Sequence, residues 1–385
     1  MLGKTNITTL SEGAIVTEIE DYRWIQLQSG IYSNFVKTIY QNGYLVAITM
    51  DGSIVYTTDG EVWNVLTLEY AECRLNDIEW DGRRFLLVGC YVKEDSNNET
   101  TGLIVATTDF EAMETITLPE YAYKEYYLIS SKNGKYVLVA KYDSYLCVVT
   151  SSSMSDIIGH EQLYNYTAST PGVQDCVAVK NSSGILVYYR LFQPAKYSSP
   201  DISSHFIKRI IDEGIISLRD YSEDFKYNHS KVFTLFECKD ILYFLGLLAK
   251  NNYSLNEVTN AGEIMVMNTG QNFMFKDGVY FNDCEVFINS HEMLVVKKGE
   301  RIAEKTLNDL IEIEPELTMN CITKAFGQLF IFGNQGVILK SSVETNNENA
   351  IAVQTLSAKK ALYDAKQYTD DRYAALEARI AALEG

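Results

Sequence analysis

The chain has 385 residues, with 33 lysines and arginines against 51 aspartates and glutamates, and its formal net charge is -18 at pH 7. So acidic a chain disfavours a nucleic-acid backbone or an anionic membrane surface as partner, because both are negatively charged. No long apolar run preceded by positive charge occurs in residues 1–22, so we expect no signal peptide, no membrane insertion and synthesis in a cytoplasm.

A strand–turn–strand pattern repeats along the chain after a short N-terminal arm (1–21) and a lone strand at 22–28. The tips of the first three copies are Asn-Gly, Asp-Gly and Asn-Gly, which supply the positive φ angles that tight hairpin turns need. The pattern predicts seven hairpins, at 36–49, 75–89, 126–140, 175–189, 232–246, 284–298 and 321–333.

Most hairpins are followed by a third strand ending in small or hydroxyl residues, and several by a short fourth strand. Third strands are expected at 52–63, 101–110, 145–154, 262–270 and 336–344, and fourth strands at 64–68, 113–118 and 310–315. Four antiparallel strands that recur roughly every 35 to 55 residues are typical of β-propeller blades, whereas a sandwich would not explain a repeated fourth strand.

The two ends of this repeat complete each other. The last copy lacks a fourth strand, and the lone strand at 22–28 places Trp24 as Trp63 is placed in the first copy. Supplying the missing strand from the N-terminus would remove an open sheet edge. We therefore predict an all-β fold, a seven-bladed β-propeller over residues 22–345 that is closed by an N-terminal strand.

The segment from Thr57 to Trp63 resembles the Asp-box hairpin of sialidase-like propellers, with one residue fewer between the Asp and the aromatic residue. Asp59 is expected to accept hydrogen bonds from backbone amides of its own turn, Gly60 to take a positive φ, and Trp63 to pack against the neighbouring blade. This motif is therefore interpreted as structural. Partial copies occur at 107–109 and 151–152.

No catalytic constellation is visible, and we predict that the chain is not an enzyme. A sialidase needs three arginines converging on a carboxylate, and the family typically carries Pro shortly after an Arg, which this chain lacks. The resemblance to sialidases is thus expected to end at the scaffold. A sialidase-like glycan hydrolase remains an alternative.

No metal site or cofactor is predicted. The four histidines are scattered, and no His or Cys pair has zinc-ligand spacing. The acidic loop 93–100 offers Asp95 and Asn97 to a calcium ion but lacks the Gly and the distant Glu of an EF-hand, so a solvated loop is favoured. The seven cysteines are odd in number and widely spaced, which favours buried, reduced thiols.

Clustered tyrosines in loop-rich segments are the candidate ligand contacts, because aromatic rings stack on sugars and contribute strongly to protein interfaces. The candidates are Tyr121, Tyr123, Tyr164, Tyr166 and Tyr197. The alternative is that each is a strand residue without a binding role, since Tyr is common in strands.

The C-terminus repeats one helical heptad twice. With Tyr373 and Ile380 at position a, the d positions are Leu376 and Leu383, the g positions are Arg372 and Arg379, and the e positions are Glu377 and Glu384; Leu362 and Ala365 continue the apolar stripe upstream. The order Arg, apolar, two residues, apolar, Glu resembles a known trimerising coiled-coil motif. The sequence therefore predicts a linker and a trimeric coiled-coil helix over residues 346–385.

Residues 365–384 also resemble the helical connectors of phage tail-fibre and tailocin proteins. This resemblance implies a homotrimeric tail fibre or receptor-binding protein of a virion or phage-tail-like particle, made in the bacterial cytoplasm. Its partners would be itself, other tail or baseplate proteins, and a bacterial cell-surface glycan or protein bound by avidity. A structural tail or baseplate component without its own receptor site is the other alternative.

Overall fold

The computed structural model describes residues 7–9, 22–93, 99–119, 121–143, 145–165, 173–181, 184–191, 207–212, 215–220, 229–248, 252–258, 264–268, 275–281, 284–289, 293–298, 301–306 and 318–343. These residues form β-strands and one short 3-10 helix, η1 (Asn334–Gly336), so the all-β prediction is confirmed for them. No helix among them has the length and apolar character needed to cross a membrane. The predicted coiled-coil residues lie outside the described part of the chain.

The described strands make seven sheets, numbered here in chain order. Sheet 1 contains β3 (Phe35–Gln41), β4 (Tyr44–Thr49), β5 (Ser53–Thr57) and β6 (Asn64–Thr67); sheet 2 contains β7 (Arg74–Trp80), β8 (Phe85–Val92), β9 (Thr100–Thr107) and β10 (Glu114–Thr115); sheet 3 contains β11 (Tyr123–Lys132), β12 (Lys135–Tyr142), β13 (Tyr145–Ser151) and β14 (Gly159–Asn165); sheet 4 contains β15 (Val173–Asn181), β16 (Gly184–Leu191), β17 (Ile207–Asp212) and β18 (Ile215–Asp220).

Sheets 5 to 7 continue the series. Sheet 5 contains β19 (His229–Cys238), β20 (Ile241–Leu248), β21 (Asn252–Val258) and β22 (Ile264–Asn268), with β1 (Ile7–Thr9) parallel to β22; sheet 6 contains β23 (Phe275–Phe281), β24 (Cys284–Asn289), β25 (Met293–Lys298) and β26 (Arg301–Thr306); sheet 7 contains β27 (Met319–Ala325), β28 (Gln328–Gly333), β29 (Val337–Val343) and β2 (Tyr22–Gln28).

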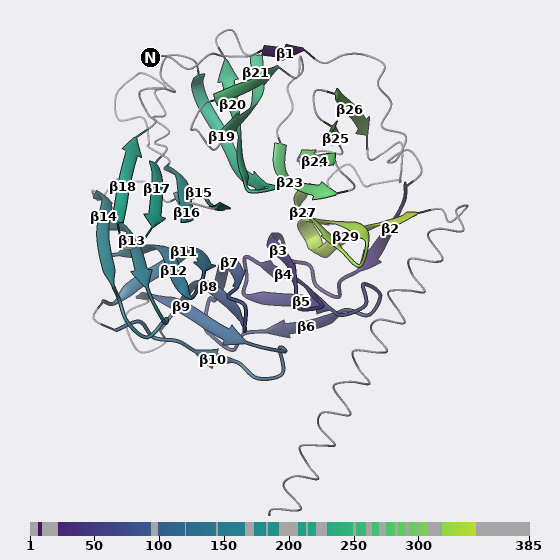
Figure 1. The fold of residues 1–385 in the computed structure, drawn as a ribbon. Coiled ribbons are helices and arrows are strands. Elements are labelled where there is room, and N and C mark those ends of the chain that lie inside the picture. Colours follow the sequence, from purple (N-terminus) through teal and green to yellow (C-terminus); the bar gives the residue numbers. More distant parts are fainter. Residues whose placement is uncertain are drawn as a thin grey trace, which may run out of the picture.

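The sheets surround a common centre (Figure 1). The first strands of successive sheets lie side by side in a closed series, β3, β7, β11, β15, β19, β23, β27 and back to β3. In sheet 7, β2 is antiparallel to β29 from Tyr22 opposite Val343 to Gln28 opposite Val337. Segments near the two ends of the chain are therefore joined in one sheet, and the strand predicted at 22–28 lies at those residues.

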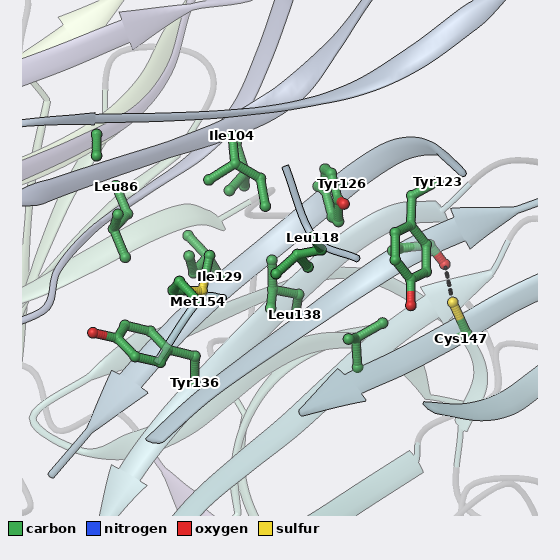
Figure 2. Packing of buried hydrophobic residues seen from close by; sticks show 14 residues of the cluster. Leu86, Ile104, Leu118, Tyr123, Tyr126, Ile129, Tyr136, Leu138, Cys147 and Met154 are labelled. Carbon is green, nitrogen blue, oxygen red and sulfur yellow. Dashed lines mark hydrogen bonds between the residues drawn. The ribbon is translucent and has the colours of Figure 1, made fainter. Parts of the chain in front are cut away.

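Apolar clusters fill the spaces between neighbouring sheets. Figure 2 shows the cluster between sheets 2 and 3, where Leu86 and Ile104 of one sheet meet Ile129 and Leu138 of the other. Successive side chains of a strand point to opposite faces of its sheet. Both faces carry apolar side chains, because each face packs against a neighbouring sheet. At the predicted Asn-Gly tip after β3, Asn42 and Gly43 have φ angles of 51° and 78°.

Every innermost strand has a register shift near its start, typical of a β-bulge. The shifts lie between Phe35 and Lys37, Leu75 and Asp77, Tyr123 and Glu125, Val173 and Asp175, His229 and Lys231, Phe275 and Asp277, and Met319 and Cys321. The extra residue re-aims the side chains that follow it. Lys37, Asp77 and Asp277 each directly follow the extra residue, so they share one position in their strands, and their charges interact with one another.

The structure corrects the place of two predicted segments within their sheets. Residues 284–298 form a hairpin as predicted, but its strands, β24 and β25, are the second and third strands of sheet 6 and not its first two. Residues 262–270, predicted as a third strand, contain β22, the fourth strand of sheet 5. The innermost strand of sheet 6 carries Lys276, Asp277 and Gly278, so its apolar alternation is interrupted. The predicted fourth strand at 310–315 lies outside the described residues.

Candidate functional site

The turn between β5 and β6 is held by two side chains. Thr57 Oγ1 accepts the backbone N–H of Gly60 at 2.9 Å, while Asp59 Oδ1 accepts those of Glu61 and Val62 at 2.8 and 2.9 Å. Gly60 has φ +75°, a conformation that favours glycine. The hydrogen bonds from the N–H groups of Glu61 and Val62 are the largest cause that lowers the pKa of Asp59.

The same turn recurs in sheets 2 and 3 without the glycine. Thr107 Oγ1 accepts the N–H of Phe110 at 2.9 Å, and Ser151 Oγ accepts that of Met154 at 2.8 Å. Phe110 and Met154 have φ angles of 64° and 60°, yet both side chains are buried. Core packing therefore offsets the strain that a non-glycine residue has there.

Trp63 packs against sheet 7, which neighbours sheet 1 in the ring, as its place in the motif predicts. Its ring lies 6.2 Å from Phe330 and 6.0 Å from Phe332 between ring centroids, in edge-to-face geometry. Trp24 of β2 likewise belongs to the cluster between sheets 6 and 7. These side chains give the turn motif a structural role at the junction of neighbouring sheets.

Replacing Asp59 by Ala is expected to lower the free energy of unfolding by about 1 kcal/mol, because the amides of Glu61 and Val62 lose their acceptor at an exposed turn. Urea denaturation at pH 7 measures the change. Asp59→Asn should cost less, since the amide oxygen still accepts. Equal losses in both variants would contradict this account of the turn.

Tyr121 and Tyr123 lie in an aromatic group with Tyr142 and His160. Tyr121 packs against His160 with ring centroids 4.2 Å apart and ring planes tilted by 34°, and the Tyr123 hydroxyl is 3.0 Å from His160 Nδ1. Tyr123 is only 3% exposed, and burial raises its pKa above the usual range. A stacking platform must present its ring face to solvent, so the ligand-contact prediction is corrected for Tyr123, which is a core residue (Figure 2).

The other predicted tyrosines are placed only in part. Tyr121 is half-buried beside this aromatic group. Tyr164 lies in β14, paired with Leu146 of β13. Tyr166 and Tyr197 lie outside the described residues, as do Asp95 and Asn97 of the acidic loop. The described part thus brings Tyr121 and Tyr123 together and leaves the remaining candidates as predictions.

Charged side chains from several innermost strands meet at the centre of the ring. Lys180 Nζ of β15 lies 2.6 Å from each carboxylate oxygen of Glu79 on β7, across the intervening sheet 3. Asp77 Oδ2 accepts the N–H of Ile129, and Asp277 Oδ2 that of Ile322, both at 2.9 Å. Each of these aspartates therefore links its own sheet to the next one.

Burial shifts the acid–base equilibria of this central group. It raises the pKa of Glu79 to about 7 despite the opposing charge of Lys180, and that of Asp277 to about 6 despite Lys37. Burial raises the pKa of Asp77 and Glu237 as well. At Lys37 burial lowers the pKa, but the charges of Asp77, Asp277 and their neighbours outweigh it, so the net shift is upward.

These shifts predict that stability falls as the pH rises from about 4.5 to about 7. A carboxyl group whose pKa is raised by folding favours the folded state while it is protonated, and this contribution is lost on ionisation. For Glu79 the shift from 4.5 to about 7 corresponds to a loss on the order of 3 kcal/mol. Urea denaturation at pH 5 and pH 8 measures the slope; equal stabilities would contradict it.

The described residues contain no group of three or more His, Cys, Asp and Glu side chains arranged to hold a metal ion. All seven cysteines are free thiols, and all but Cys176 are buried. Burial raises the pKa of Cys73 to about 11, so this thiol is unreactive at neutral pH. Arg83 and Arg84 lie at the tip between β7 and β8, where Arg84 pairs with Asp81 at 3.4 Å.

No family model and no curated protein sequence matches this chain. Similar solved structures include a virginiamycin B lyase of Staphylococcus aureus with quinupristin (12% identity, TM-score 0.59, covering 83% of this chain and 99% of that one) and a streptogramin B lyase (10%, 0.56, 84% and 98%). A further one is the WD40 β-propeller domain of Doa1 (11%, 0.54, 84% and 98%). At these identities the likeness concerns the fold alone, and the fold of this chain is a β-propeller.

Proposed function

We propose that the chain is the receptor-binding part of a phage or phage-derived tail, a homotrimer that adheres to a bacterial cell-surface glycan or protein without transforming it. The observation that carries the proposal is the doubled heptad of residues 372–385, which follows a β-propeller. In this reading the seven sheets are seven blades, β2 completes the last one, and the Asp-box-like turn after β5 stabilises the first.

Multivalency explains why such a chain would be useful. Three weak sites on one trimer give an effective concentration on the order of millimolar for the second contact, so overall binding rises by roughly 10² to 10⁴. Each propeller supplies a rigid platform, because its sheets are linked by buried contacts and by the hydrogen bonds of Asp77 and Asp277. Tyr121, which is half-buried, is the candidate ligand contact among the described tyrosines.

The charges at the centre favour binding over a sialidase-type reaction. The cations described there are Lys37 and Lys180, each surrounded by carboxylates. Arg83 and Arg84 lie instead at a hairpin tip. A sialidase-like site would need arginines converging on one carboxylate, whereas the central carboxylates described above are paired with lysines.

Labelled full-length protein incubated with a panel of bacterial strains tests this function. We expect saturable binding to some strains, competed by soluble envelope polysaccharide or by protease treatment of the cells. Release of reducing sugar would instead support the sialidase-like alternative. Absence of cell binding, together with co-purification with tail particles, would support a structural tail or baseplate component.

A further inference from the structure

We propose that the outer surface where sheets 7 and 1 meet is a contact surface for a second copy of this chain. This junction patch consists of Ile25 on β2, Val62 in the turn before β6, and Val65 on β6. The inference rests on the trimer of the proposed function and deepens it, because it places the propellers against one another instead of leaving them tethered only by their C-terminal helices.

The patch gathers three of the six large apolar side chains that are exposed in the described part of the chain. Ile25 is 42%, Val62 65% and Val65 44% exposed. Scattered apolar residues on a surface are ordinary, but a group of them on one rim is typical of an interaction site. The other three, Tyr32, Met50 and Ile158, lie outside these two edge strands.

Hydrogen bonds and packing bring the three side chains onto one surface. Ile25 is opposite Lys340 in the ladder between β2 and β29, and Lys340 Nζ donates to Gly60 O at 3.4 Å and to the Glu61 carboxylate. That places β2 beside the turn that carries Val62. Gly30, just after β2, lies against Val65, since a Cβ added there would be 3.6 Å from Val65 Cγ2.

The edge strands here lack the charges that usually protect a sheet edge. By sequence, β6 (Asn64–Thr67) contains no charged residue, and β2 (Tyr22–Gln28) contains only Arg23. By contrast, β26 (Arg301–Thr306) carries three charged residues and β18 (Ile215–Asp220) two. The exposed Glu61 has its carboxylate paired with Lys340, whereas the Asp59 carboxylate, which accepts the Val62 N–H at 2.9 Å, keeps its charge at the border of the patch.

The chain continues from this same rim. Val343, the last residue of β29, pairs with Tyr22 at the start of β2, three residues from Ile25. Residues 344–352, even if fully extended, span at most about 30 Å before the predicted helix begins. A three-helix coil would therefore hold three sheet-7 edges near one axis. On a chain of net charge -18, an apolar patch whose neighbour Glu61 is paired with Lys340 is a place where copies repel less.

Hydrogen exchange by mass spectrometry on the full chain tests the proposal. The amides of β2 and of residues 62–67 are expected to exchange about tenfold more slowly in the wild-type trimer than in the monomeric variant Leu376→Asp/Leu383→Asp, a difference that corresponds to about 1.4 kcal/mol. In the coil-intact variant Val62→Lys/Val65→Lys, β2 amides should lose this protection while light scattering still reports a trimer. Ile158→Lys, an exposed apolar residue outside the patch, is the matched control and should keep it.

The outcomes separate this inference from the function on which it rests. A wild-type trimer with fast exchange at 62–67 overturns the inference and leaves the trimer standing. Slow exchange in both the trimer and the monomeric variant also overturns it, because the chain then covers the patch by itself. A wild-type chain that is monomeric by light scattering overturns both the trimer and the inference. Circular dichroism of each variant establishes that it is folded.

Discussion

Replacing Lys180 by Met is expected to lower the free energy of unfolding by about 1.4 kcal/mol at pH 8 and to leave it nearly unchanged at pH 5. At pH 8 Glu79 is ionised, buried, and paired with Lys180 at 2.6 Å. Without the ammonium, Glu79 takes up a proton instead of remaining a buried carboxylate without a counter-charge. Because its pKa in the wild type is about 7, protonation at pH 8 costs about 1.4 kcal/mol, which limits the expected loss.

The pH dependence is what separates this prediction from a general packing defect. The pKa of Glu79 is raised to about 7, so at pH 5 the group is protonated and needs no cation. Urea denaturation of both proteins at pH 5 and pH 8 gives the comparison. Equal losses at the two pH values would show that Lys180 acts through its methylene stem and not through its charge.

Two further variants serve as controls. Glu79→Gln should be nearly neutral or stabilising at pH 8, because it removes the cost of ionising a buried group, and it should flatten the pH dependence. Lys124→Met removes a surface ion pair with Asp143 at 3.9 Å, and its effect should be below about 1 kcal/mol at both pH values. A pH-dependent loss in Lys124→Met would point to net charge as the cause.

The sequence predicted the repeating strands because their pattern is local. Strict alternation and Asn-Gly or Asp-Gly tips are visible within about 15 residues, and Asn42, Gly43, Asn133 and Gly134 have the positive φ angles expected. The pattern failed where strands are polar. β21 reads Asn-Tyr-Ser-Leu-Asn-Glu-Val, and β23 carries Lys276 and Asp277. Neither strand was recognised, so the predicted strands next to them in sheets 5 and 6 were each placed one strand too early in the sheet.

The charged group at the centre was not predicted, since its members lie in different repeats. Glu79 and Lys180 are 101 residues apart and meet only because the sheets surround one centre. An alignment of the repeats with one another could have found part of this charged group. Lys37, Asp77 and Asp277 occupy equivalent positions, each directly after the unpaired extra residue of a β-bulge. Tyr123 shows the converse: a tyrosine cluster in the sequence does not reveal which ring is buried.

Replacing Leu376 and Leu383 by Asp is expected to convert the trimer into monomers and to weaken attachment to cells by roughly 10² to 10⁴. Both leucines occupy the d position of the predicted heptads, where an apolar side chain packs into the facing helices and a carboxylate is not tolerated. The propeller itself is untouched by these changes. The affinity of a single site should therefore persist, and only the gain from simultaneous contacts is lost.

Light scattering gives the mass, and titration of labelled protein on cells gives the apparent affinity. The matched control is Ala378→Asp/Ala381→Asp, which adds the same two charges at the outward f and b positions of the same heptads and should stay trimeric. Loss of binding in the control would mean that charge near the cell surface is responsible. A monomeric double-leucine variant that binds cells as tightly as the wild type would show that adhesion does not depend on avidity.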